Sequence, residues 1–151
     1  MKKNFLLSIA LLVSALVSAQ PAPGSFKQTW KVGPDWLRNG VIYQVYPSSY
    51  KDSDGNGIGD IQGVISKLDY IESLGVSAIW FNPLFVSGWI DGGYDVIDFY
   101  RVDPRFGTNN DLVELIRKAH DKGIKVMLDL VAGHTSDKHP WFLQSAQDSN
   151  L

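Results

Sequence analysis

Acidic and amide side chains alternate with small residues along the segment 52–60. The run Asp-Ser-Asp-Gly-Asn-Gly-Ile-Gly-Asp places oxygen-bearing side chains at every second position from 52 to 56, and again at 60. Carboxylate, amide and backbone carbonyl oxygens are the ligands that Ca²⁺ prefers, and their order follows an EF-hand loop through its ninth position. The sequence therefore predicts a bound Ca²⁺ with these ligands: Asp52, Asp54, Asn56, Ile58 through its backbone carbonyl, and Asp60.

This calcium loop differs from an ordinary EF-hand in two respects. Its twelfth position is Gly63, where a bidentate glutamate is usual, and a strand-like segment precedes it instead of a helix. Monodentate ligands and water would then complete the coordination, and a fully ligated cation leaves no open position for chemistry. We expect a structural ion, and the alternative is a glycine-rich Asx turn that needs no metal.

Three apolar segments rich in β-branched and aromatic residues, 41–46, 76–81 and 125–131, are typical of buried strands. Two amphipathic segments lie between them. The first is predicted to be one helix over 64–74 that ends at Gly75. The second is predicted to begin at the capping pair Thr108 and Asp111, and to end at Gly123.

Residues 82–107 are rich in glycine, aspartate and aromatic residues, and we expect a long functional loop there. Strands that alternate with helices indicate parallel βαβ units, and hence the α/β class. A parallel sheet of three strands would leave two edges open and its faces poorly covered. The sequence therefore predicts a part of a larger α/β fold.

Composition and the first residues bear on location. The net charge of −2 gives no sign of nucleic-acid partners, and without cysteine the fold must depend on packing, metal or both. Lys2 and Lys3 precede an apolar run and a Val17-Ser18-Ala19 cleavage site, so residues 1–19 are predicted to be a signal peptide. The alternative, a membrane anchor, is disfavoured because the run is short for a hydrocarbon core of ~30 Å.

Residues 20–34 then form a Pro-rich linker before the folded domain at 35–151. The expected location is exported, either periplasmic or extracellular, with no membrane association after signal cleavage.

Six segments in order resemble motifs of the α-amylase family of glycoside hydrolases. They are Gly40–Pro47, the calcium loop with its continuation to Gly63, Ala78–Pro83, Asp91–Val96, Tyr100–Gly107 and Asp129–His134. The resemblance implies that the chain forms the first three β/α units of a TIM (β/α)8 barrel. It also implies an α-glucan or α-glucoside as the partner.

Residue by residue, the resemblance implies that Asp91, Tyr94 and His134 bind the glucose on the non-reducing side of the bond, while Asp129 supports the site. These types suit the task, because an aromatic face stacks on a pyranose and polar groups orient its hydroxyls. The alternatives are a turn aspartate, a core tyrosine and a surface histidine.

Trp89 is a further candidate for sugar stacking. His120 and His139 are expected to be solvated.

Gly133 stands where the family usually has an asparagine that binds a second calcium, so that ion is not expected. The resemblance also implies that the catalytic carboxylates come from later strands, so we expect no catalytic residue within this chain. We expect the 151 residues by themselves to be inactive and poorly folded.

The activity implied for the whole protein is α-glucoside hydrolysis with retention. The alternatives are a transglycosylase resembling trehalose synthase or amylosucrase, a non-catalytic sugar-binding protein and a plain calcium-binding module.

Overall fold

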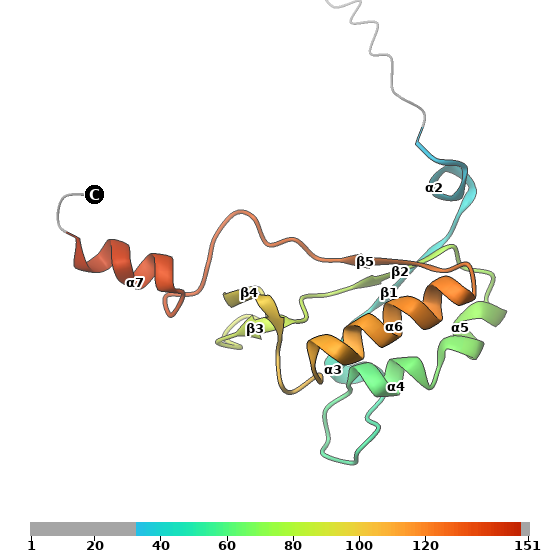
Figure 1. Cartoon of the computed structure of the whole chain (residues 1–151), viewed down its shortest axis with the longest axis horizontal. Coiled ribbons are helices and arrows are strands. Elements are labelled where there is room, and N and C mark those ends of the chain that lie inside the picture. Colours follow the sequence, from blue (N-terminus) through green and yellow to red (C-terminus); the bar gives the residue numbers. More distant parts are fainter. Residues whose placement is uncertain (1–32, 149–151) are drawn as a thin grey trace, which may run out of the picture. The chain divides into compact units, whose positions relative to one another are not determined.

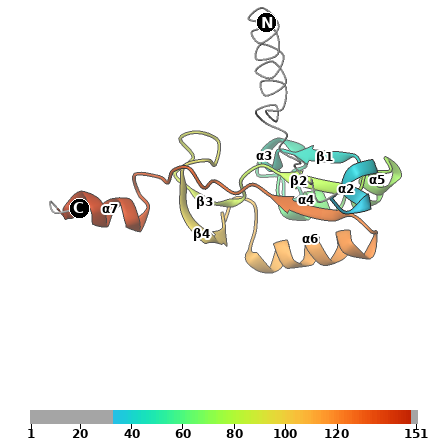
Figure 2. The same cartoon turned by 90° about the horizontal axis from the view of Figure 1, so that it is seen from above.

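The computed structural model describes residues 33–148, so the predicted signal peptide and most of the linker lie outside the described residues. Three parallel strands form a sheet with the order β1-β2-β5: β1 (Ile42–Val45), β2 (Ala78–Phe81) and β5 (Lys125–Leu128). The three predicted strands are confirmed, each shorter than its apolar run by one to three residues at an end. Figures 1 and 2 show this sheet edge-on and face-on.

The register of the sheet separates its two faces. Val45, Phe81 and Leu128 are aligned across the three strands and contact the hydrophobic core. One residue earlier, Gln44, Trp80 and Met127 are aligned in the same way, and alternation places them on the opposite face. The helix-facing side of the sheet is therefore apolar, while the other side carries polar and large side chains.

Helices α4 (Ile61–Ile65), α5 (Leu68–Ser73) and α6 (Asn109–Asp121) lie on one side of the sheet (Figure 1). The single helix predicted over 64–74 is wrong, because the chain breaks between α4 and α5. The Ser66 hydroxyl donates to the Gly63 carbonyl at 2.6 Å, and Lys67 leaves the helical region with φ −108° and ψ 4°. This side-chain bond competes with the helical ladder.

Helix α6 begins as its sequence predicts. The Asp111 backbone N–H donates to Thr108 Oγ1 at 3.2 Å, and the Thr108 N–H donates to the Asp111 carboxylate at 2.7 Å. These reciprocal bonds satisfy two of the free donors at the start of the helix. Gly123 follows the helix with φ +74°, a conformation that favours glycine.

We predict that Thr108→Ala lowers the free energy of unfolding by about 1 kcal/mol, the usual cost of a lost N-cap. Hydrogen bonds from Thr108 and then Gln62 hold the pKa of Asp111 below its ordinary 3.8. The associated stability is present above that ordinary value and is lost as pH falls through the lower, folded-state pKa. Denaturant titrations in acid should therefore show a shallower decline for Thr108→Ala. Asn110→Ala, at an exposed position of the same turn, is the control.

The prediction of one long loop over residues 82–107 is wrong. They contain an antiparallel pair, β3 (Phe85–Ser87) and β4 (Val96–Val102). The run Val-Ile-Asp-Phe-Tyr-Arg-Val in β4 has the β-branched and aromatic composition of a strand, although glycines and aspartates surround it.

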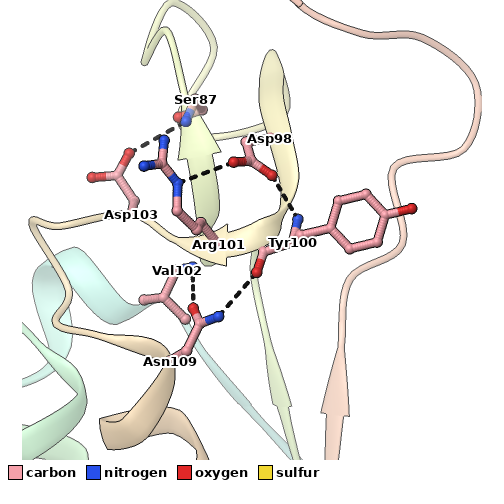
Figure 3. Close-up of polar contacts among 7 residues, drawn as sticks. All are labelled: Ser87, Asp98, Tyr100, Arg101, Val102, Asp103 and Asn109. Carbon is pink, nitrogen blue, oxygen red and sulfur yellow. Dashed lines mark hydrogen bonds and ion pairs between the residues drawn. The ribbon is translucent and has the colours of Figure 1, made fainter.

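Side-chain carbonyl and carboxylate groups tie β4 to its neighbours (Figure 3). Asn109 accepts from the Val102 N–H at 2.8 Å and donates to the Tyr100 carbonyl at 3.0 Å. Asp103 is buried and accepts from the Ser87 N–H at 3.3 Å. The Asn109 bonds join β4 to the start of α6, and the Asp103 bond joins the end of β4 to β3.

Three short helices complete the described residues: α2 (Asp35–Asn39), α3 (Pro47–Tyr50) and α7 (Pro140–Gln147). Helix α7 was not predicted. His139 was expected to be solvated, but it is buried and caps α7, where its Nδ1 accepts from the Trp141 N–H at 3.1 Å. His120 is exposed, as expected. Within residues 33–148, no helix has the length and apolarity required to span a bilayer.

Candidate functional site

Polar side chains gather where the parallel strands end. Gln44, Trp80 and Met127 share the face opposite the helices, and the same alternation continues to Asn82 after β2 and to Asp129 after β5. The carboxyl ends of parallel strands meet at one edge of a sheet, which is where α/β barrels build their sites. The candidate site therefore begins at this edge.

A directed chain of hydrogen bonds crosses this edge. Gln44 Nε2 donates to Asn82 Oδ1 at 3.0 Å, and Asn82 Nδ2 donates to the Tyr94 hydroxyl at 3.1 Å. The Tyr94 hydroxyl donates in turn to Asp129 Oδ2 at 2.8 Å, while Trp80 Nε1 donates to Asp129 Oδ1 at 2.9 Å. Asp129 thus accepts one donor on each oxygen, which fixes both its own plane and the position of the Tyr94 hydroxyl.

This hydrogen bonding also sets the protonation of Tyr94. The bond to Asp129, together with burial, raises the pKa of the Tyr94 phenol above its ordinary 10.0, although the Asn82 bond acts in the opposite direction. The Asp91 carboxylate adds to the raised pKa. Tyr94 therefore stays neutral at physiological pH and presents a half-buried aromatic ring near a negative charge.

Asp91 and His134 form an exposed pair beside this chain. His134 Nε2 lies 4.0 Å from Asp91 Oδ2, and both side chains are more than half exposed. The other oxygen, Asp91 Oδ1, accepts from the Asp95 N–H at 2.7 Å. One carboxylate oxygen is thus fixed by the backbone, while the other and the imidazole are accessible to a ligand that offers hydroxyl groups.

His134 also borders an open groove of about 940 Å³ between β4 and the segment after β5. Tyr100 and Trp141 contribute aromatic rings to its lining, and both are strongly exposed. The structure thus brings Tyr94 and Asp129 into contact, and Asp91 and His134 within reach of each other.

Trp89 is not placed for sugar stacking, contrary to that expectation. The Arg105 guanidinium lies over its ring, 4.2 Å from the centroid, and Phe106 packs edge-on at 5.4 Å between centroids. Trp89 also packs against the hydrophobic core. One face of the indole is therefore covered by a cation, and its role here is to support the loop.

Gln44, Trp80 and Asn82 are site residues that the motif reasoning missed. Each stands inside a segment whose pattern predicts only a strand or its end. The signal that would have found them is the period of two, which places positions 44, 80, 82 and 129 on one face at one edge. The Trp80–Asp129 bond joins residues 49 positions apart, and no local pattern specifies it.

The predicted calcium loop closes around its own carboxylates. Asp52 accepts from the backbone N–H groups of Asp54, Gly55 and Gly57, at 3.1, 2.7 and 2.8 Å. Gly55 and Gly57 have φ of +82° and +91°, which side-chain-bearing residues rarely adopt. Each turn of the loop is therefore held by an aspartate or asparagine oxygen.

Asp60 joins this loop to helix α4. Its Oδ1 accepts from the Gly63 N–H at 2.6 Å, and its Oδ2 accepts from the Ser53 N–H and hydroxyl, both at 2.9 Å. Burial raises the pKa of Asp60, but the bonds from Ser53 and Gly63 outweigh it and the net shift is downward. The pKa of Asp52 is also lowered, chiefly by the Gly57 and Gly55 N–H groups.

The loop residues suit a hard cation. Asp52, Asp54 and Asp60 each offer a carboxylate oxygen, and these atoms lie within 4.8 Å of one another. Asp52 and Asp60 are held ionised by N–H donors. Asp52 Oδ2 and Asp60 Oδ1 each accept only one hydrogen bond, so each retains a lone pair for a metal. The donor set is all oxygen, which matches Ca²⁺ chemistry.

Comparison with known proteins identifies the family of this fold. Residues 44–150 match the model of the alpha-amylase catalytic domain. The chain therefore belongs to the α-amylase family of glycoside hydrolases, and its parallel sheet with crossover helices is the N-terminal portion of that family's TIM barrel.

Individual relatives support the same assignment. The chain is 53% identical over 111 residues to a probable alpha-glucosidase of Rhizobium meliloti, covering 74% of this chain and 20% of that protein. It is 45% identical over 116 residues to an oligo-1,6-glucosidase of Heyndrickxia coagulans, covering 77% and 21%. The crystal structure of an isomaltulose synthase from Klebsiella sp. LX3 superposes with a TM-score of 0.76 at 45% identity, covering 78% and 21%. The chain thus spans about a fifth of the length of these relatives.

Proposed function

We propose that the whole protein containing these residues is a retaining enzyme that hydrolyses α-glucosides. The observation that carries the proposal is the fixed Tyr94–Asp129 pair beside the accessible Asp91–His134 pair. It supplies an aromatic ring for a pyranose and directional groups for its hydroxyls. Relatives named as glucosidases, at 45–53% identity, support the substrate class.

Each residue has a distinct part in this proposal. Tyr94 stacks on the apolar face of the glucose, and its electron-rich ring shields positive charge as the transition state becomes oxocarbenium-like. Asp91 and His134 hydrogen-bond sugar hydroxyls, and Asp129 holds Tyr94 in place. A retaining mechanism also needs two carboxylates about 5–5.5 Å apart. We assign neither of these to residues 33–148.

Transglycosylation is the second candidate, because the chain superposes on an isomaltulose synthase. The two activities share the glucose site and differ in the acceptor that attacks the glycosyl intermediate, which is water or a sugar hydroxyl.

Product analysis tests both candidates. The whole protein, incubated with p-nitrophenyl α-glucoside, isomaltose or sucrose, should release free α-glucose as its first product. Disaccharides of new linkage at early times would favour transfer. An absence of both products, together with retained binding of glucose, would indicate a non-catalytic sugar-binding protein and contradict the proposal.

We further propose that the loop 52–60 binds a structural Ca²⁺ through Asp52, Asp54, Asn56, the Ile58 carbonyl and Asp60. Its proposed effect is to fix the crossover between β1 and α4. Support comes from the three converging carboxylates and the hydrogen bonds that keep Asp52 and Asp60 ionised.

We predict that excess Ca²⁺ raises the melting temperature of the whole protein relative to EDTA. At a free concentration 100 times the Kd, the linkage amounts to about 2.7 kcal/mol. Asp54→Asn keeps a side-chain oxygen but removes a charge, and should abolish most of the calcium-dependent shift. Asp121→Asn, in an exposed ion pair on α6, is the control. Equal calcium shifts in both variants would contradict a site in this loop.

Export is proposed on the sequence pattern of residues 1–19. N-terminal sequencing of the protein from culture medium or periplasm should give Gln20 as the first residue. Retention of Met1 on the mature protein would reject this part of the proposal.

A further inference from the structure

Asp95 lies beneath the turn that presents Asp91, at the start of β4. Its side chain is buried, with an exposed fraction of 8%. Three hydrogen bonds connect Asp95 to this turn. Its N–H donates to Asp91 Oδ1 at 2.7 Å, its Oδ1 accepts from the Ile90 N–H at 3.2 Å, and its carbonyl accepts from the Gly88 N–H at 3.2 Å. The turn from Gly88 to Asp95 is therefore closed by one residue.

The same turn stores backbone strain. Trp89 has φ +59°, and it is the only non-glycine residue with positive φ between residues 33 and 148. For a large side chain this conformation is strained and persists only where the surroundings enforce it. Arg105 covers the Trp89 ring, and Asp103 holds Arg105 through an ion pair of 2.9 Å. The outer side of the turn is thus braced as well.

The space for the Asp95 carboxylate depends on Gly88. A Cβ atom at position 88 would collide with Asp95 Oδ2. That oxygen is buried and has no hydrogen-bond partner among the described residues. A buried polar atom without a partner is destabilising, so a packing role alone would be better served by an apolar side chain.

We propose that Asp95 is a positioning residue for Asp91: it locks the strained turn so that one Asp91 oxygen is held by the backbone and the other is directed at the sugar beside His134. This inference rests on the proposed function, in which Asp91 binds substrate hydroxyls. The reciprocal bonds between residues 90, 91 and 95 set the orientation of the Asp91 carboxylate before substrate arrives. Preorganisation of this kind matters because a misplacement of about 1 Å can cost on the order of 100-fold in rate.

The test compares variants of the whole protein in a double-mutant cycle. Asp95→Ala should lower kcat/KM for p-nitrophenyl α-glucoside on the order of 100-fold. Asp95→Asn retains a carbonyl acceptor for the Ile90 N–H, and should recover most of that loss. In an Asp91→Ala background, Asp95→Ala should cost less than about twofold more, because a residue that acts only through Asp91 has nothing left to position.

Ser87→Ala is the matched control. Ser87 lies in the same hairpin, and its hydroxyl is also buried without a partner among the described residues, but its side chain makes no bond to the turn. Its substitution should leave kcat/KM near the wild-type value. Independent losses of similar size in the two backgrounds, or no rescue by Asp95→Asn, would overturn the proposal in favour of a purely structural role.

Amide hydrogen exchange tests the hydrogen bond from the Asp95 N–H to Asp91 without any assay of activity. In Asp91→Ala, the Asp95 amide should exchange faster, while the Ile90 amide keeps its protection. This variant leaves Asp95 itself intact, so the reading does not depend on whether Asp95→Ala folds. Unchanged protection of the Asp95 amide would overturn the proposed coupling between Asp91 and Asp95. Loss of that protection in a protein that cleaves no α-glucoside would support the coupling and reject the proposed enzymatic function instead.

Discussion

Replacement of Gly63 by alanine should destabilise the protein by roughly 3 kcal/mol, a large loss of stability for the addition of a single methyl group. A Cβ atom at this position would overlap the backbone carbonyl oxygen of Lys51. That carbonyl is not free to move away, because it accepts from the Asp60 N–H at 3.0 Å. The backbone must therefore shift at Gly63 or at Lys51.

The damage should extend beyond packing. Gly63 donates its N–H to Asp60 Oδ1 at 2.6 Å, so a displaced residue 63 releases the N-cap of α4 and one of the proposed calcium ligands. We therefore expect Gly63→Ala to bind calcium more weakly as well as to unfold earlier. A variant in which the two effects separate would show that the loop and the helix are not coupled through Asp60.

Gly133→Ala provides the comparison in the same protein. No atom lies within 4 Å of a Cβ built at Gly133, and its φ is outside the left-handed region. This variant should change the free energy of unfolding by less than about 1 kcal/mol. Urea denaturation of both variants, fitted with a common slope, measures the difference. Equal stability of the two would refute the close approach of Gly63 to Lys51.

Local chemistry made part of this structure predictable. The capping pair Thr108 and Asp111 and the helix stop at Gly123 each depend on residues close in the sequence. The structure confirms all three. The helix break at Ser66 could not be predicted from apolar spacing, because it depends on where one hydroxyl finds its acceptor. Leu74, predicted to lie on the apolar stripe, is 45% exposed at the end of α5.

At the candidate site, too, local motifs predicted some residues but not their partners. Asp91, Tyr94, Asp129 and His134 were predicted from motifs that each occupy a few consecutive residues. The partners Asn82 of Tyr94 and Trp80 of Asp129 come from the end of β2, so they required the register of the sheet. Trp89 shows the opposite failure: an aromatic residue in a glycine-rich loop suggested a sugar contact, but Arg105 and Phe106 occupy its surroundings.

Loss of Asp129 should strongly reduce activity, because it removes the acceptor of two hydrogen bonds at the site. Asp129→Ala leaves the Tyr94 hydroxyl and the Trp80 indole N–H without their acceptor. We expect kcat/KM of the whole protein to fall about 100-fold or more, equivalent to about 2.7 kcal/mol of lost transition-state stabilisation. The reason is that Tyr94, once released, no longer holds its ring where the charge develops.

A graded series tests this reason. Tyr94→Phe keeps the ring and removes one bond, so it should be the mildest change. Asp129→Asn keeps one carbonyl acceptor but turns an NH₂ group toward the second donor, which should give an intermediate loss. Because Tyr94 and Asp129 share a hydrogen bond, their combined substitution should cost less than the sum of the single effects.

Steady-state kinetics with p-nitrophenyl α-glucoside, with Asp121→Asn as the control, checks the order. If Asp129→Ala retained kcat/KM within a factor of about three, below 1 kcal/mol, Asp129 would not position Tyr94 for catalysis. Full additivity of the two substitutions would lead to the same conclusion by an independent route, since it would mean that the 2.8 Å bond between them carries no coupling.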